Sequence, residues 1–151
     1  MIYLALLYEQ LKRIDDAVAL YDEKLKQAPT SVSLNNNLAI LLATYRQDSA
    51  SKDRALQLVK KFEVSDSSHD LDTLGWVYYL RSEYDQAINT LLQAEKLSPN
   101  VVTIQYHLAF TYFAKSNHDL ARKYLQTVIK AEPAFAKRQD VVQIMEKLKI
   151  T

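Results

Sequence analysis

The sequence predicts an all-α fold made of stacked antiparallel helix hairpins. The first observation is a repeat: Pro99 and Pro133 stand 34 residues apart (133 − 99 = 34), and the residues before each proline recur in register. The second is composition, because one glycine and three prolines among 151 residues favour helices joined by short turns. A fixed period of this length is typical of helical repeat arrays, which generally work as binding surfaces rather than as catalysts.

Four copies of the repeat can be aligned, and they are predicted to cover about 1–31, 32–67, 68–101 and 102–136. The second copy lacks a closing proline. Its two small residues are also further apart than those of the third copy (55 − 39 = 16 against 87 − 75 = 12), so we predict four extra residues in its loop, within Arg46–Lys52. The recurring residues are Leu74, Gly75, Tyr78, Ala87, Leu91 and Ala94 in the third copy, and Leu108, Ala109, Tyr112, Ala121, Leu125 and Val128 in the fourth.

Each repeat is predicted to form two helices that cross at small residues. A larger side chain at such a crossing would overpack it, at a cost of about 1–3 kcal/mol or more. An aspartate stands two residues before the second small residue of each repeat, where it offsets the positive end of the second helix. The crossing residues are Ala5, Ala39, Gly75 and Ala109 on the first helices and Ala17, Ala55, Ala87 and Ala121 on the second, and the aspartates are Asp15, Asp53, Asp85 and Asp119.

Nine helices are expected in total, because a C-terminal capping helix follows the fourth repeat within residues 137–151. One side of that segment is apolar, and the other carries charges of both signs, so the apolar side should cover the fourth repeat while the polar side ends the stack. The apolar residues are Val141, Val142, Ile144, Met145 and Leu148. The predicted helices are 2–12, 15–28, 32–46, 52–64, 69–81, 84–97, 102–115, 118–131 and 137–149.

Taken together, the recurring residues resemble the tetratricopeptide repeat (TPR) family. The resemblance covers about 130 residues, and the third copy matches best, with Leu71 where the family often has tryptophan. It implies a right-handed α-solenoid that binds proteins. The run Leu71–Tyr79 is also similar, more weakly, to the C-terminal part of bacterial envelope or exopolysaccharide (exosortase-system) TPR proteins.

Composition and motifs exclude several other classes of function. The net charge of +1 gives no electrostatic basis for binding nucleic acid or an anionic membrane. The lack of cysteine removes thiol chemistry and leaves the compartment open, so bacterial periplasm and cytoplasm both fit. The histidines His69, His107 and His118 lack metal-ligand spacing, and His118 is expected in a solvated turn. We therefore predict no enzyme activity, no catalytic residue, no metal site and no cofactor.

The TPR resemblance implies a concave groove lined by the first helix of each repeat. Ligand-facing positions fall near the second, fifth, ninth and twelfth residue of a repeat, and they include His69 and Thr103. We expect partial burial of the aromatic residues at these positions, with at least three of five exposed in the groove. The basic residues with which some TPR proteins grip a terminal carboxylate are missing, so an acidic C-terminal tail is not expected as the ligand. The predicted groove residues are Asn36, Ile40, Asp72, Trp76, Tyr79, Tyr106, Phe110 and Phe113.

The predicted function is a non-enzymatic protein–protein interaction scaffold that binds a peptide or helix with apolar or aromatic side chains, without inserting into a membrane. Two alternatives stay open: a structural, homo-oligomerising module, and a helper domain of a longer bacterial envelope protein. Met1–Leu7 is apolar but too short to span a membrane. Ile2, Tyr3 and Leu6 give the first repeat no polar outer face, so we expect a fragment of a longer protein whose N-terminal helix can form a homodimer.

Overall fold

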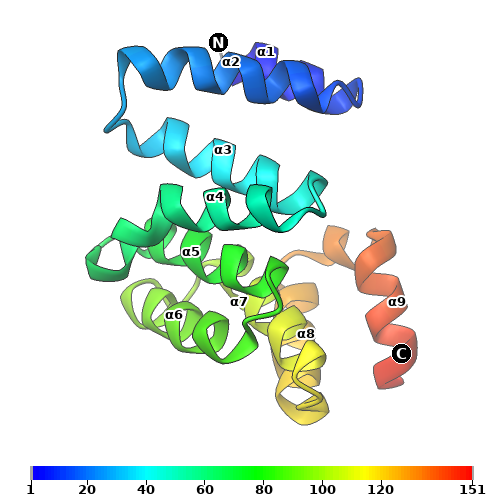
Figure 1. The fold of residues 1–151 in the computed structure, drawn as a ribbon. Coiled ribbons are helices and arrows are strands. Elements are labelled where there is room, and N and C mark those ends of the chain that lie inside the picture. The colour runs from blue at the N-terminus through cyan, green and yellow to red at the C-terminus, as the bar shows by residue number, and fades with distance from the viewer. Residues whose placement is uncertain (1, 151) are drawn as a thin grey trace. The chain divides into compact units, whose positions relative to one another are not determined.

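The computed structural model describes the backbone of residues 2–150 and the side chains of residues 3–150. This part of the chain forms nine α-helices and two short 3-10 helices and contains no strand, which confirms the predicted all-α fold (Figure 1). The elements are α1 (Ile2–Gln10), α2 (Ile14–Gln27), α3 (Val32–Tyr45), α4 (Ser49–Val59), η1 (Lys60–Val64), α5 (Ser68–Leu80), α6 (Tyr84–Leu97), α7 (Val102–Ala114), α8 (His118–Ala131), η2 (Pro133–Lys137) and α9 (Gln139–Leu148).

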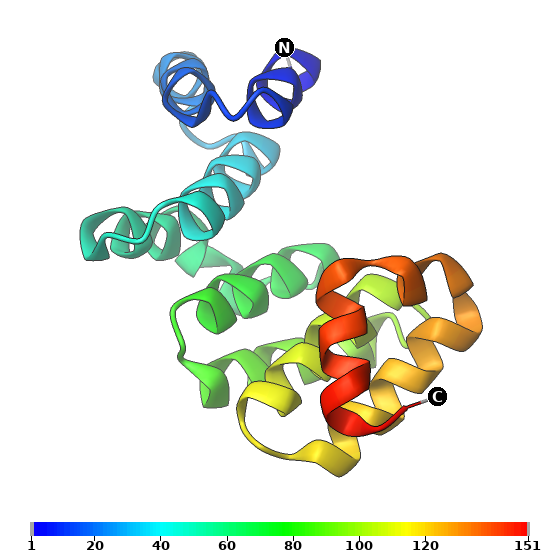
Figure 2. The same cartoon turned by 90° about the vertical axis from the view of Figure 1, so that its right-hand side faces the viewer.

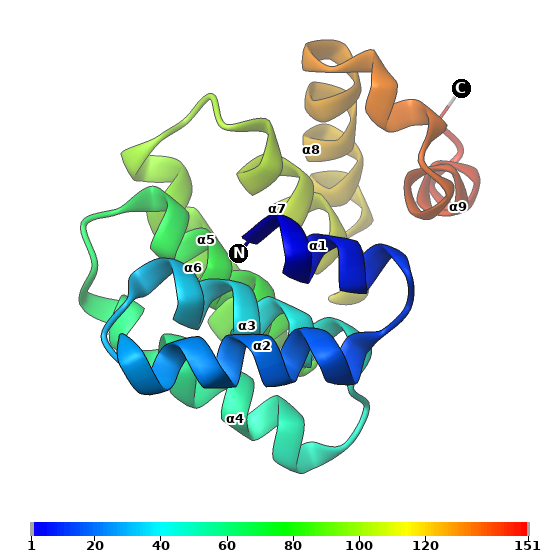
Figure 3. The same ribbon diagram turned by 90° about the horizontal axis from the view of Figure 1, so that it is seen from above.

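The chain divides into two compact units, Met1–Val64 and Ser65–Thr151. In the N-terminal unit, α1 packs on α2, α3 packs on α4, and α2 also contacts α3. In the C-terminal unit, α5 packs on α6, α7 packs on α8, and α9 lies against α8 (Figures 2 and 3). Each hairpin falls within one predicted repeat, while the points where one repeat ends and the next begins stay a prediction.

At the crossing of α5 and α6, the backbone of Gly75 lies against the side chain of Leu91. A Cβ atom on Gly75 would stand 2.6 Å from Leu91 Cγ and 3.4 Å from the carbonyl oxygen of Ala87. Carbon atoms prefer to be about 3.5–4.0 Å apart, so only glycine fits without a shift of its neighbours. The small residues at the other predicted crossings are fully buried: Ala5, Ala17, Ala39, Ala55, Ala109 and Ala121.

The second hairpin differs from the prediction at its turn. The expected long loop within Arg46–Lys52 is absent, because α3 ends at Tyr45 and α4 begins at Ser49. The extra residues instead lengthen α4 at its N-terminus, and the expected helix at 52–64 becomes α4 followed by η1. Asp48 explains the earlier start, since its side chain accepts a hydrogen bond of 2.8 Å from the backbone N–H of Ser51 and caps the helix.

The predicted helix-start aspartates are confirmed in three hairpins and wrong in one. Asp15, Asp85 and Asp119 lie in the first turn of α2, α6 and α8. Asp53 lies beyond the first turn of α4, because that helix begins earlier than expected. Two of these aspartates also link successive hairpins, through ion pairs of Asp15 with Arg46 and of Asp85 with Lys115. Such exposed pairs contribute about 0–1 kcal/mol each.

The first helix of three hairpins ends in the same way. A residue with positive φ follows the helix, and the next backbone N–H bonds to the carbonyl five residues earlier, which satisfies a carbonyl left free at the helix end. The end of α9 has the same arrangement, so α9 terminates like the first helix of a further repeat. The left-handed residues are Lys12, Ser82, Ser116 and Lys149, and the bonds run from Arg13 to Tyr8, Glu83 to Tyr78, Asn117 to Tyr112 and Ile150 to Met145.

The last helix, α9, buries an apolar stripe in the core of the C-terminal unit. Val141, Ile144 and Leu148 belong to the same cluster of buried residues as Leu125 and Val128 of α8. Two positions at which α7 packs against its second helix carry polar residues in α9. Ala109 and Tyr112 of α7 correspond to Gln143 and Glu146 of α9.

Two details of the capping segment correct the prediction. Lys137 belongs to η2 rather than to the helix, because Pro133 starts a separate 3-10 turn and Arg138 then has an extended backbone. Val142 is exposed rather than part of the buried stripe. Among the described residues, no second helix covers a valine at this position.

Candidate functional site

One face of the first helices in the C-terminal unit carries a regular set of side chains. Residues 34 positions apart take equivalent places on α5, α7 and α9 (106 − 72 = 34 and 140 − 106 = 34). Contacts join neighbouring helices at these places: Tyr106 Oη donates a hydrogen bond of 2.6 Å to Asp140 Oδ2, and the Lys147 ammonium lies 5.7 Å from the Phe113 ring. The equivalent sets are Asp72, Tyr106 and Asp140; Trp76, Phe110 and Ile144; and Tyr79, Phe113 and Lys147.

Trp76 of α5 lies at the centre of the rings on this face. Its indole stacks on the Tyr79 ring, with centroids 4.4 Å apart, and on the His107 imidazole at 4.1 Å. The edge of Phe110 meets it at 6.4 Å and Tyr106 lies 6.0 Å away. Stacked and edge-to-face rings at these separations add about 0.5–1.5 kcal/mol per pair beyond the burial of area, so the indole is held firmly in one orientation.

The five predicted groove aromatics, called here the aromatic cluster, differ in exposure. Tyr106 and Phe110 are only 5% and 7% exposed and belong to the core of the C-terminal unit. Trp76, Tyr79 and Phe113 are partly buried and pack against that core. Three of the five therefore reach the surface, and the other two belong to the core on which these three pack.

Burial raises the pKa of the Tyr79 phenol, and burial together with the hydrogen bond to Asp140 raises the pKa of Tyr106 further. Both groups are therefore protonated donors at neutral pH. Burial alone would raise the pKa of Asp140, but hydrogen bonds from Arg138 and Tyr106 outweigh it, and the pKa lies below its ordinary value.

Arg138 joins the capping segment to this face, and the sequence analysis did not single it out. Its guanidinium lies beside two neighbouring rings, 4.8 Å from the centroid of Tyr106 and 5.3 Å from that of Phe135. It also donates to Asp140 at 2.9 Å and to the Tyr106 hydroxyl at 3.1 Å. The arginine follows Tyr106 by 32 residues (138 − 106 = 32), two fewer than the repeat period, so the period alone does not pair the two.

His107 and Asp72 form a second polar contact that the sequence analysis did not predict. The Asp72 carboxylate accepts a hydrogen bond of 2.7 Å from His107 Nδ1, and the two side chains are 10% and 12% exposed. The other histidines are not part of this contact: His69 is exposed on α5, and His118 is the first residue of α8 rather than part of a turn. The His118 ring stacks on Phe113 at 5.6 Å.

A hollow of about 270 Å³ lies where α5 and α7 begin. Three predicted ligand-facing residues, His69, Asp72 and Thr103, line it together. The remaining lining residues are Ser68, Val101 and Ile104. The hollow is therefore polar on the side of α5, and it has an apolar wall where α7 begins.

Family models match the chain in three places. A TPR repeat model matches residues 75–116, and two tetratricopeptide repeat models match residues 102–135 and 1–31. The chain belongs to the tetratricopeptide repeat family. TPR proteins are typically non-enzymatic scaffolds that bind proteins, and this chain is a protein-interaction scaffold in that sense. The comparisons do not show the weaker similarity to exosortase-system proteins.

Solved TPR structures share the fold at low sequence identity. A thermophilic TPR protein of Thermus thermophilus is 18% identical, with a TM-score of 0.81 over 97% of this chain and 80% of that chain. MamA of Desulfovibrio magneticus RS-1 is 19% identical, with a TM-score of 0.67 over 87% and 73%. A TPR protein of Parabacteroides merdae is 16% identical, with a TM-score of 0.70 over 96% and 57%. No curated protein sequence matches the chain.

The two remaining predicted groove residues of this TPR chain lie on α3, in the N-terminal unit. Asn36 is buried, and its Nδ2 donates a hydrogen bond of 3.4 Å to Asn37 Oδ1. Ile40 is partly buried one turn later. Their part in ligand binding stays a prediction.

Between residues 2 and 150, the TPR fold presents no cluster of three or more histidine and carboxylate side chains arranged to hold a metal ion. Within the same residues, every helix is too short or too polar to cross a membrane.

Proposed function

We propose that this TPR chain is a non-enzymatic scaffold whose groove binds a peptide or helix through apolar or aromatic side chains. The aromatic cluster and Asp72 form the groove floor in the C-terminal unit, and Asn36 and Ile40 serve the same role on α3. The observation that carries the proposal is Trp76, whose partly exposed indole is fixed between the rings of Tyr79 and His107. A large ring that is already ordered loses little conformational entropy when a ligand packs on it.

The chemistry of the ligand follows from the exposed part of the cluster. Trp76, Tyr79 and Phe113 offer ring faces and edges, and aromatic residues of this kind dominate the binding energy of many protein interfaces. The Tyr79 phenol stays protonated and adds a hydrogen-bond donor that can orient the ligand. A ligand with two or three apolar side chains at helical or extended spacing fits this surface.

Trp76→Ala should weaken ligand binding by about 2 kcal/mol or more, roughly thirtyfold, because it removes the central ring of the groove. Peptides selected from a random display library against the wild-type protein serve as ligands, and calorimetry gives their affinities. The matched control is Leu92→Ala, which removes an exposed apolar side chain from the second helix α6. Unchanged affinity for Trp76→Ala, with the helical circular dichroism signal intact, would refute the groove.

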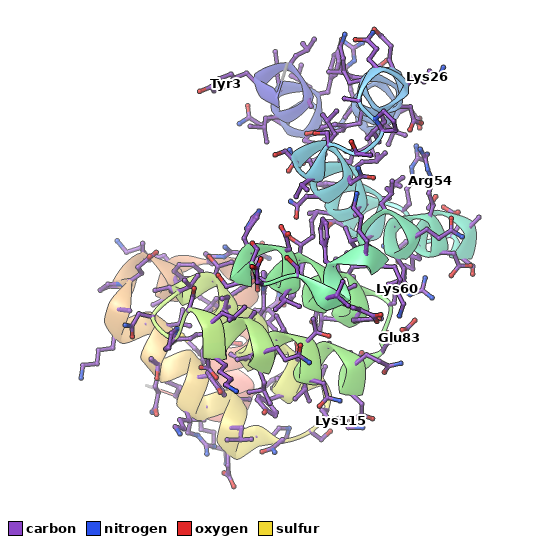
Figure 4. All side chains as sticks on the ribbon, turned by 90° about the vertical axis from the view of Figure 1, so that its left-hand side faces the viewer. Tyr3, Lys26, Arg54, Lys60, Glu83 and Lys115 are labelled. Atoms are coloured by element: carbon purple, nitrogen blue, oxygen red, sulfur yellow. The ribbon has the colours of Figure 1, made fainter. Side chains whose placement is uncertain are left out.

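A second candidate function is self-association through α1, because that helix is apolar on nearly every side. Tyr3 is 87% exposed and points away from α2 (Figure 4), and Leu6, Leu7 and Leu11 are about half exposed. The side chain of Ile2, also part of the predicted interface, lies outside the described residues. An apolar face is complementary to a copy of itself in a two-fold dimer. Solution mass across a concentration range, compared between wild type and Leu7→Glu, separates this candidate from a monomeric scaffold.

A further inference from the structure

The hollow where α5 and α7 begin contains a buried carboxylate with an unusual partner. The Asp72 side chain is 10% exposed, and its ion-pair partner among the described residues is His107, which is charged only when protonated. When the imidazole is neutral, the pair keeps the full negative charge of the carboxylate. A buried negative charge without a cation close by is costly, so it attracts a positively charged ligand.

Two other aspartates of the C-terminal unit have permanent cationic partners. Asp140, which is equivalent to Asp72 in the repeat, pairs with Arg138 at 2.9 Å. Asp85 pairs with Lys115, also at 2.9 Å. Neither lysine nor arginine lines the hollow beside Asp72. The position that Arg138 fills next to Asp140 has no equivalent beside Asp72, because residue 104 is Ile104 (138 − 34 = 104).

We propose that this hollow binds a cationic nitrogen, an ammonium or guanidinium group carried by the groove ligand. The inference rests on the proposed function, since the hollow lies at the end of the same groove. The volume of about 270 Å³ accepts a side chain of the size of lysine or arginine. Val101 and Ile104 pack against its methylene stem, and the Asp72 carboxylate accepts charge-assisted hydrogen bonds from its head. The hydroxyls of Ser68 and Thr103 provide further acceptors.

Small molecules test the hollow without a peptide. Backbone amide shifts of Ser68, His69 and Thr103 are followed by NMR at about pH 8. Butylammonium and butylguanidinium should shift these amides saturably, at concentrations at least about tenfold lower than 1-butanol, and butyrate should not bind. Equal binding of the cations and of butanol would overturn the proposal.

Asp72→Asn is the decisive variant, because it keeps the size of the side chain and an oxygen that can accept from His107 while removing the charge. The preference for cations over butanol should fall to within about twofold. Asp85→Asn, a change of the same kind at an exposed carboxylate, should leave the preference intact. Amide shifts outside the hollow report whether each variant keeps its fold. A cation preference that survives in folded Asp72→Asn would also overturn the proposal.

Peptide ligands show whether a side chain or the α-amino group supplies the cation. They also distinguish a failure of the cation site from a failure of the groove. In display-selected groove peptides, lysine→norleucine or arginine→norleucine should weaken binding to the wild type about tenfold and leave binding to Asp72→Asn unchanged. N-terminal acetylation has the same effect if the α-amino group is the cation. Peptides that bind through Trp76 but respond to neither change would refute the cation site and leave the groove standing. If binding of no peptide depends on Trp76, the groove proposal is refuted. The butylammonium experiment then still tests whether the hollow binds a cation.

Discussion

Deleting residues from Lys137 onward should destabilise the C-terminal unit by about 5 kcal/mol or more, or cause the protein to aggregate. The deletion removes the buried side chains of Val141, Ile144 and Leu148, and burial of each such side chain contributes about 1.5–3 kcal/mol. It also uncovers the apolar surface of α7 and α8 on which α9 packs, and an exposed patch of this kind promotes association. The melting temperature and the solution mass of the truncated protein measure the two effects.

A pair of point variants separates a packing role for α9 from a simple effect of chain length. Ile144→Asp places a charge in the core and should cost about 3 kcal/mol or more. Gln143→Asp makes a similar change at the neighbouring, exposed position and should stay within about 0.5 kcal/mol of the wild type. A truncated protein that remains monomeric with an unchanged melting temperature would show that α9 is not a cap.

The repeat period predicted most of the fold because it fixes which residues face one another. Gly75 shows this at the level of one atom: the period placed it at a helix crossing, and the structure leaves no room there for a Cβ. The period did not predict where α4 begins. Local capping by Asp48 decides that boundary, and a single copy with an insertion contains no periodic signal for it.

The sequence predicted which residues make up the candidate site but not how deeply each side chain is buried, and their role in binding stays a prediction. The ligand-facing positions that the TPR resemblance implies selected the aromatic cluster, yet they could not show that Tyr106 and Phe110 would be buried while Trp76, Tyr79 and Phe113 reach the surface. Tyr106 is covered by the capping segment, because the Phe135 ring of η2 and the Arg138 guanidinium pack on it outside the repeat pattern. The contact of Asp72 with His107 escaped prediction for a related reason, because it joins residues one position away from the strict period (107 − 72 = 35).

Gly75→Leu should destabilise the C-terminal unit by about 3 kcal/mol, the upper end of the range for overpacking. The first added carbon already stands 2.6 Å from Leu91 Cγ, and Leu91 is fully buried, so neither residue can move aside without disturbing the core. Gly75→Ala adds about 1 kcal/mol of helix propensity, which offsets part of the same clash, and its net cost should be about 0–2 kcal/mol. Urea unfolding of both variants gives these free energies.

A variant of Leu91 tests whether its contact with residue 75 causes the loss of stability. If contact with Leu91 is responsible, Gly75→Ala should cost less in a Leu91→Ala background than in the wild type, with a coupling energy of about 0.5 kcal/mol or more. Asn89→Leu adds bulk at an exposed position of α6, the helix that contains Leu91, and should change the free energy of unfolding by less than about 0.5 kcal/mol. Additive costs for Gly75→Ala and Leu91→Ala would mean that the glycine is required for a reason other than the approach of α5 to α6.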